Sequence, residues 1–280
     1  MFEKPSPLRS RTNVRYSESS MGFNNPSVPW SELEQTLSGR AKAAKEEDEH
    51  VLRTGGDSPA WSRTREPYEP HPDVVAPTNT TPYAELHCHS NFSFLDGASD
   101  PEVLVEEAAR LGLGALALTD RNGFYGVVRF AEAAKAYGIA TVFGAELSLT
   151  DPANEVVGAA GDLVVLARGP AGYARLGRAI SEGQMAGEKG APRYYLDRLG
   201  ELSGDEWIVL TGTQRGPLSA ALERNGPIAA QRTLDTLIEA FDRSNIAVEL
   251  WDHATPLCST RNDALARLCL LYTSPSPRDS

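Results

Sequence analysis

The sequence predicts an α/β fold in which a parallel sheet, open or closed into a barrel, is covered by helices. From Tyr83 onward, short apolar runs alternate with helix-period stretches of about 10 to 15 residues, and this alternation is typical of βα units. At least six such units follow one another. The hydrophobic content of 41% is sufficient for a real core.

Composition limits the functional classes. The net charge of −11 argues against a surface dedicated to nucleic-acid phosphates, because such binding depends on clustered Lys and Arg. The chain has three cysteines, Cys88, Cys258 and Cys269, and no two of them form a CxxC pair. This usage fits a protein of the reducing cytoplasm. No run of about 20 apolar residues occurs, so we expect a cytoplasmic protein with no membrane partner.

The chain divides into three predicted parts. Residues 1–82 are rich in Ser, Pro, Asn, Thr and charge and are predicted to form a mostly disordered extension. Residues 83–268 form the folded domain. Its strands are predicted at Ala84 to Cys88, Ala115 to Thr119, Thr141 to Glu146, Leu163 to Ala167, Trp207 to Thr211 and Ile246 to Leu250. Its helices are predicted from Ser99 to Leu111, and at Val127 to Tyr137, Ala171 to Glu182, Ile228 to Phe241 and Asn262 to Leu270.

The third part, residues 269–280, is predicted to be a non-native tail. From Leu271 to Ser280 the alternation stops abruptly, and these residues are assigned to no element. The string is similar to the translated sequencing-adapter tail that ends many assembled reading frames. We therefore expect the natural protein to continue past about Leu268. The alternative is an ordinary flexible C-terminus.

His87 and His89 lie two residues apart at the end of the first predicted strand. Residues i and i+2 of a strand project from the same face, so both imidazoles could turn toward one ion. The pair is therefore a metal-ligand signal. Alone, it could equally be two solvated histidines on a surface strand.

Acidic residues follow the ends of the first three predicted strands. Asp96 comes after the first, Asp120 and Arg121 after the second, and Glu146 closes the third. Buried charges are costly unless they are paired or bind a cation, and a shared metal site would explain all of them together. Three alternatives remain open. Asp96 could be a turn residue, Asp120 could cap its turn, and Glu146 could pair with Arg121 without a metal.

These motifs, taken together, resemble a known family. His87-Cys88-His89-Ser90, Leu95-Asp96-Gly97, Thr119-Asp120 and Gly144-Ala145-Glu146 are similar to the motifs of the polymerase-and-histidinol-phosphatase (PHP) domain. The longer string from Ala84 through Leu147 resembles the N-terminal domain of bacterial error-prone DNA polymerases, which are relatives of the DNA polymerase III alpha subunit. The resemblance covers about Tyr83 to Leu268. It implies a distorted seven-stranded β/α barrel, here truncated at its C-terminal end.

The resemblance also implies a set of metal ligands. His87, His89, Asp96 and Glu146 match ligand positions of the family. Asp120 and Asp162 are weaker candidates, and Asp162 stands where a histidine is common. Arg121 stands where the family usually has a histidine ligand, and a guanidinium has no free lone pair for a cation. Thr213 stands where a cysteine or histidine is common. We therefore expect Zn or Mn at reduced occupancy, and an ion pair from Arg121 to Glu146 or Asp96.

The implied function belongs to a longer protein. The resemblance implies a DNA-directed DNA polymerase for damage-induced mutagenesis and translesion synthesis, with Mg in an absent polymerase domain, and with DNA, a sliding clamp and accessory mutagenesis proteins as partners. This chain would contain no catalytic residue and would serve as a structural or docking domain. The alternative is a free-standing metal-dependent phosphoesterase of the histidinol-phosphatase type. His253, near a predicted strand end, is interpreted as a loop histidine.

Overall fold

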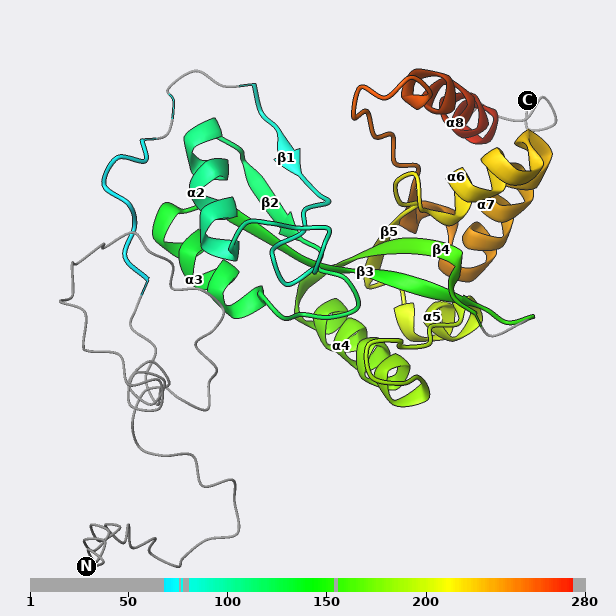
Figure 1. The fold of residues 1–280 in the computed structure, drawn as a ribbon, viewed down its shortest axis with the longest axis horizontal. Coiled ribbons are helices and arrows are strands. Elements are labelled where there is room, and N and C mark those ends of the chain that lie inside the picture. The colour runs from blue at the N-terminus through cyan, green and yellow to red at the C-terminus, as the bar shows by residue number, and fades with distance from the viewer. Residues whose placement is uncertain (1–67, 76, 78–80, 154–155, 274–280) are drawn as a thin grey trace, which may run out of the picture. The chain divides into compact units, whose positions relative to one another are not determined.

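The structure, a computed structural model, describes residues 68–75, 77, 81–153 and 156–273, which all belong to one unit beginning at Glu66 (Figure 1). Six strands form one sheet in the order β1-β2-β3-β4-β5-β6. The strands are β1 (Ala84–Glu85), β2 (Ala115–Leu118), β3 (Ala140–Asp151), β4 (Val156–Ala167), β5 (Trp207–Leu210) and β6 (Ile246–Ala247). The α/β class is confirmed. The predicted extension up to residue 82 falls largely on residues 1–67, outside the described residues, and stays a prediction.

The helices fill the connections between the strands. They are α2 (Pro101–Leu111), α3 (Val127–Tyr137), α4 (Gly169–Ala186), α5 (Leu196–Ser203), α6 (Pro217–Asn225), α7 (Pro227–Phe241) and α8 (Cys258–Thr273), with a 3₁₀ turn η1 (Arg243–Asn245) before β6. The helix α3 has the predicted bounds, and α2 ends where predicted because Gly112 adopts a left-handed φ of 71°. Neither α5 nor α6 was predicted. None of the described helices is long and apolar enough to cross a membrane.

The expectation of an all-parallel sheet is wrong. The pairs β1–β2, β2–β3 and β5–β6 are parallel, but β4 runs antiparallel to both β3 and β5. The strands β3 and β4 continue well past their predicted limits and form a long hairpin. The backbone N–H of Ala153 donates to the Asp151 carboxylate at 2.8 Å, a turn signal that the regular alternation of strands and helices obscured. As a result, Glu146 and Asp162 lie inside strands, not at strand ends.

The interpretation that the chain from Leu271 onward belongs to no element is also wrong for its first residues. Helix α8 continues through Leu271 to Thr273. No glycine or proline interrupts the sequence before Pro275, so nothing stops the helix at Leu268. The remaining residues, 274–280, lie outside the described part of the chain.

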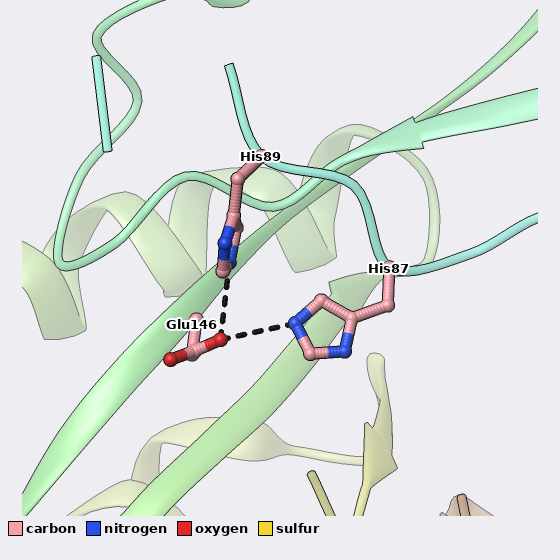
Figure 2. Close-up of side chains that lie close together, drawn as sticks. All are labelled: His87, His89 and Glu146. Atoms are coloured by element: carbon pink, nitrogen blue, oxygen red, sulfur yellow. Dashed lines mark hydrogen bonds and ion pairs between the residues drawn. The ribbon is translucent and has the colours of Figure 1, made fainter. Parts of the chain in front are cut away.

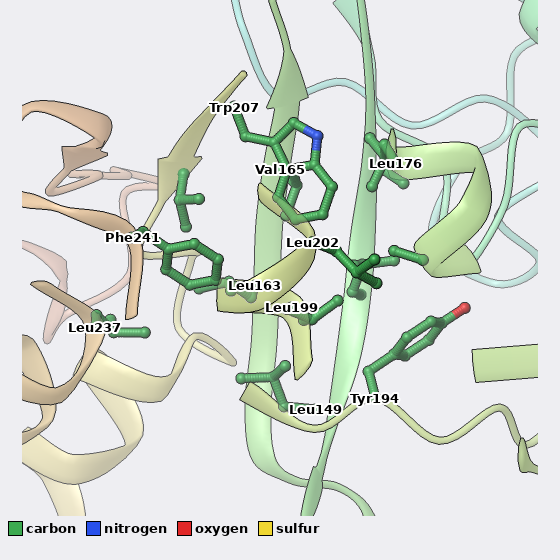
Figure 3. Packing of buried hydrophobic residues seen from close by; sticks show 14 residues of the cluster. Leu149, Leu163, Val165, Leu176, Tyr194, Leu199, Leu202, Trp207, Leu237 and Phe241 are labelled. Carbon is green, nitrogen blue, oxygen red and sulfur yellow. The ribbon is translucent and has the colours of Figure 1, made fainter. Parts of the chain in front are cut away.

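The largest apolar cluster lies between strands β3 to β5 and helices α4, α5 and α7 (Figure 3). The buried face of β3 contributes Ala145, Leu147 and Leu149 to it. Trp207 of β5 also belongs to this cluster and is only 1% exposed. Its indole N–H donates to the carbonyl of Gly172 at 2.9 Å. Since the apolar side chains alternate along β3, the opposite face of the strand is left to Glu146 and Ser148.

The two edges of the sheet approach each other near β1 and β6. These strands lie at opposite ends of the strand order, and no strand pairing joins them within the described residues. Even so, His87, two residues after β1, contacts Glu249, two residues after β6, with 2.8 Å between His87 Nδ1 and Glu249 Oε1. The sheet is therefore curled so that side chains, not strand hydrogen bonds, join its edges.

Candidate metal centre

The two histidines lie on an extended segment that continues from β1 alongside β2. Both the backbone N–H and the hydroxyl of Thr119 donate to the Cys88 carbonyl, at 2.9 and 3.1 Å. The backbone N–H of His87 donates to the Glu85 carboxylate at 3.0 Å. This anchoring places the imidazoles of His87 and His89 over the polar face of β3.

One oxygen of the Glu146 carboxylate contacts both histidines. The Nε2 atoms of His87 and His89 each lie 3.0 Å from Oε2 of Glu146, and both dashed lines in Figure 2 meet at that oxygen. Burial opposes ionisation of Glu146, yet the two histidines outweigh it and hold the pKa of the carboxyl well below its usual range. Burial also disfavours the His87 cation, but hydrogen bonds to Glu146 and Glu249 raise the His87 pKa to about 9.

The donor set fits a divalent cation. His87, His89 and Glu146 each offer a ligand atom, and these atoms lie within 4.8 Å of one another. His89 Nε2 is buried and, among the described residues, lacks a well-aligned hydrogen-bond partner despite its closeness to Glu146. Two imidazole nitrogens and a carboxylate oxygen are a donor set that zinc and manganese accept. This buried nitrogen is thus positioned as a ligand atom for an ion.

The other oxygen of Glu146 faces two arginines. Oε1 lies 3.1 Å from Nη2 of Arg121 and 3.8 Å from Nη2 of Arg215. Both guanidiniums also contact Asp96 and Asp162. Arg121 lies 3.5 Å from Asp96 and pairs closely with Asp162, while Arg215 lies 3.1 Å from Asp96 and 3.3 Å from Asp162. Burial and the Glu146 charge raise the pKa of Asp162, and Arg121 acts in the opposite direction.

The site therefore has two halves that share Glu146. The histidine half contains His87 and His89, and the arginine half contains Arg121 and Arg215 with Asp96 and Asp162. Asp96 lies in the arginine half, although the sequence predicts it to be a metal ligand together with the two histidines. The arginine side chains are 30% and 50% exposed, so this half opens toward solvent, whereas the Glu146 side chain is 3% exposed.

Asp120 lies outside both halves. Its oxygens accept hydrogen bonds of 2.8 to 2.9 Å from the backbone N–H and hydroxyl of Ser90 and from the hydroxyl of Ser93. The Ser93 hydroxyl also accepts the backbone N–H of Arg121 at 3.0 Å. Asp120 thus fastens the loop after His89 to the end of β2.

Three residues of the site were not found from the sequence: Arg215, and Glu249 and Trp251, which both contact His87. Glu249 carried the same signal as Glu146, an acidic residue closing an apolar run. Arg215 lies in the loop between β5 and α6, and nothing in its neighbourhood distinguishes it from a surface arginine. His253 is exposed and lies in no helix or strand, in agreement with its interpretation as a loop histidine, and its ring is 4.5 Å from that of Trp251.

Comparison with known families assigns the chain. Residues 85–253 match the model of the PHP domain, so the chain belongs to the PHP domain family. This match covers every residue of the two halves.

Among curated proteins, the chain is similar to error-prone DNA polymerases. That of Mycobacterium bovis is 49% identical over 251 residues, covering 89% of this chain and 22% of the relative, and that of Cutibacterium acnes is 44% identical over 254 residues with the same coverage. The chain thus spans about a fifth of the length of these relatives. Among solved structures, a protein of Bifidobacterium adolescentis assigned by prediction as a metal-dependent phosphoesterase aligns with a TM-score of 0.49 and 15% identity, over 70% of this chain and 85% of that one.

Proposed function

We propose that this chain is the N-terminal PHP domain of an error-prone DNA-directed DNA polymerase, and that the domain is not itself a competent phosphoesterase. The first part is supported by the similarity to error-prone polymerases over 89% of the chain. The second part is supported by the arginine half of the site. On this proposal the domain stabilises or docks within the longer protein, and nucleotidyl transfer takes place elsewhere.

The observation that carries the proposal is the pairing of two guanidiniums with three carboxylates. Metal-assisted phosphoester hydrolysis commonly uses two ions about 4 Å apart, each with oxygen or nitrogen ligands. Here Arg121 and Arg215 engage Asp96, Asp162 and one oxygen of Glu146, which removes these oxygens from a second ion. The positive charge that metals would bring is supplied by arginines, which cannot activate water.

A single divalent ion, Zn or Mn, is proposed for the histidine half. His87, His89 and Glu146 would hold it, and Asp96, Asp120 and Asp162 would not be ligands while the contacts described above persist. When bound, such an ion supplies a Lewis acid. His87 and His89 hold the segment after β1 against β3 and shield the Glu146 carboxylate from water. Their role in the chain is therefore structural.

The proposal is tested by assaying the 280-residue chain with Mn or Zn for 3'-5' exonuclease and phosphatase turnover. We expect none above background. A matched variant, Arg121→His, places an imidazole where the family usually has one, and a control, Arg178→His, changes an arginine paired on the surface of α4. Robust turnover by the unaltered chain would contradict the proposal and favour the alternative, a free-standing phosphoesterase of the histidinol-phosphatase type.

The activity of the longer protein is a proposal as well. We propose templated DNA synthesis during DNA repair and translesion synthesis in the cytoplasm, with Mg at the polymerase site and with DNA, a sliding clamp and accessory mutagenesis proteins as partners. Primer extension by the protein from the complete locus, across an abasic site, tests this directly. A complete locus without a polymerase region would contradict it.

A further inference from the structure

The segment after β6 reaches across the open edge of the sheet to one histidine. Oε1 of Glu249 lies 2.8 Å from Nδ1 of His87, and the ring of Trp251 lies against the same imidazole with a centroid distance of 5.0 Å and an interplanar angle of 42°. The Glu249 side chain is 14% exposed and that of His87 is 4% exposed. This contact is therefore a shielded one, where a charge-assisted hydrogen bond is strong.

The backbone also holds Glu249 in place. Its N–H donates to the hydroxyl of Thr211, just past the end of β5, at 3.0 Å. This hydrogen bond fixes the backbone of Glu249 against the end of β5, and so fixes the point from which its carboxylate extends. Its second oxygen, Oε2, is buried without a hydrogen-bond partner among the described residues, so the side chain is committed to His87 through Oε1 alone.

The two ring nitrogens of His87 consequently have different tasks. Nδ1 faces Glu249, while Nε2 faces Glu146 and His89. When a cation displaces the Nε2 proton, a carboxylate that accepts the Nδ1 proton keeps that proton on Nδ1, and it also fixes the ring orientation. The tilted ring of Trp251 lies against the same imidazole and restricts its rotation.

We propose that Glu249 is a positioning residue for a divalent cation in the histidine half, acting through His87. It selects the tautomer of His87 that presents Nε2, and through this contact binding of the ion is coupled to the joining of β1 and β6. The inference rests on the single-ion site of the proposed function. It goes beyond that site by assigning a residue outside the expected ligand set.

The test is calorimetric titration of the metal-free 280-residue chain with Zn, and separately with Mn. Glu249→Leu should weaken binding about 10- to 100-fold, the usual effect of removing such a partner. Glu249→Gln keeps an acceptor oxygen and should fall between Leu and the unaltered chain. The control Glu239→Gln changes an exposed glutamate on α7 and should leave affinity unchanged.

A second measurement separates positioning from a purely structural role. Long-range ¹H–¹⁵N spectra of the Zn-loaded protein should show the Nδ1 proton of His87 held in a hydrogen bond, and in Glu249→Leu this proton should exchange with water and lose its resonance. Glu249→Gln keeps an acceptor oxygen, should preserve the resonance, and so guards against a Leu variant that fails to fold.

Two outcomes would overturn the inference: equal affinities for the unaltered chain, Glu249→Gln and Glu249→Leu, or an unaltered chain that binds neither Zn nor Mn. In the second case the polymerase assignment would stand, because it does not depend on the ion. Conversely, phosphoesterase turnover would defeat the proposed function without altering the affinity ratio between the Glu249 variants.

Discussion

The two faces of β3 are stabilised by different kinds of interaction. One face packs Ala145, Leu147 and Leu149 into the largest apolar cluster, and the other presents Glu146 to two histidines and two arginines. Both faces are buried, with Leu147 0% and Glu146 2% exposed. The apolar face depends on shape and volume, whereas the polar face depends on which charges surround one carboxylate. A change on the apolar face should therefore have the larger effect on stability, and a change on the polar face should also alter ion binding.

The largest effect is expected on the apolar face. Trp207→Ala should lower the free energy of unfolding by about 3–5 kcal/mol, because it leaves a large cavity and deprives the Gly172 carbonyl of its donor. Urea unfolding followed by circular dichroism measures this. The exposed Ile228 of α7 provides the control, since Ile228→Ala should change stability by about 0.5 kcal/mol or less. A loss below about 1 kcal/mol for Trp207→Ala would mean that the cluster is not the main core.

Adding a cation should stabilise the polar face. At a free Zn concentration of 100 times its dissociation constant, the free energy of unfolding should rise by about 2.7 kcal/mol. His89→Ala should abolish most of this rise, because it removes the nitrogen that lacks an aligned protein partner. Thermal unfolding with Zn and with a chelator compares the two states, and an equal Zn response in His89→Ala would place the ion elsewhere.

Removing the shared charge should have a smaller effect in the metal-free protein. Glu146→Gln keeps the shape of the side chain but leaves buried cationic groups without their anion, at a cost of about 1–3 kcal/mol. Ser148 lies on the same face of β3, and Ser148→Ala serves as the matched control because it removes no charge. It deletes a long hydrogen bond of 3.3 Å from Asn122 and a hydrogen bond to the Asp162 carboxylate. If both variants cost the same, the charge of Glu146 does not organise the site.

The smallest effect is expected from the exposed arginine. Arg215→Ala should cost about 0–1 kcal/mol, because its side chain is 50% exposed and its ion pairs are screened by solvent. Arg121→Ala should cost more, since its side chain is only 30% exposed and its contacts with Glu146 and Asp162 are closer than those of Arg215. Urea unfolding of both variants gives the ranking, and the reverse order would show that Arg215 is the main cation of the arginine half.

Local patterns predicted the elements better than their directions. The helix at Val127–Tyr137 has its predicted bounds because its apolar period and the following Gly138 are both local signals. The reversal of β4 could not be predicted in the same way, because an apolar run such as Leu163 to Leu166 has the same pattern in either direction. The hairpin that determines the direction depends on pairing over the full length of β3.

The site was predictable where its residues are close in sequence. His87 and His89 are two residues apart and show their spacing directly, and Glu146 closes an apolar run. Arg215 and Glu249 reach the site only through folding, from loops about 50 to 160 residues away from the residues they contact. An ion pair of Arg121 with Glu146 or Asp96 was expected. That Arg121 pairs with both, and shares Asp162 with a second arginine, needed the structure.

The most direct test of the account is the number of metal ions per chain. Native mass spectrometry of the protein after equilibration with Zn, and separately with Mn, counts them. Because Arg121 and Arg215 occupy the carboxylates of one half, we predict a single ion at saturation and none in His89→Ala. Two or three ions bound to the unaltered chain would contradict the account, since the arginines would then not replace cations.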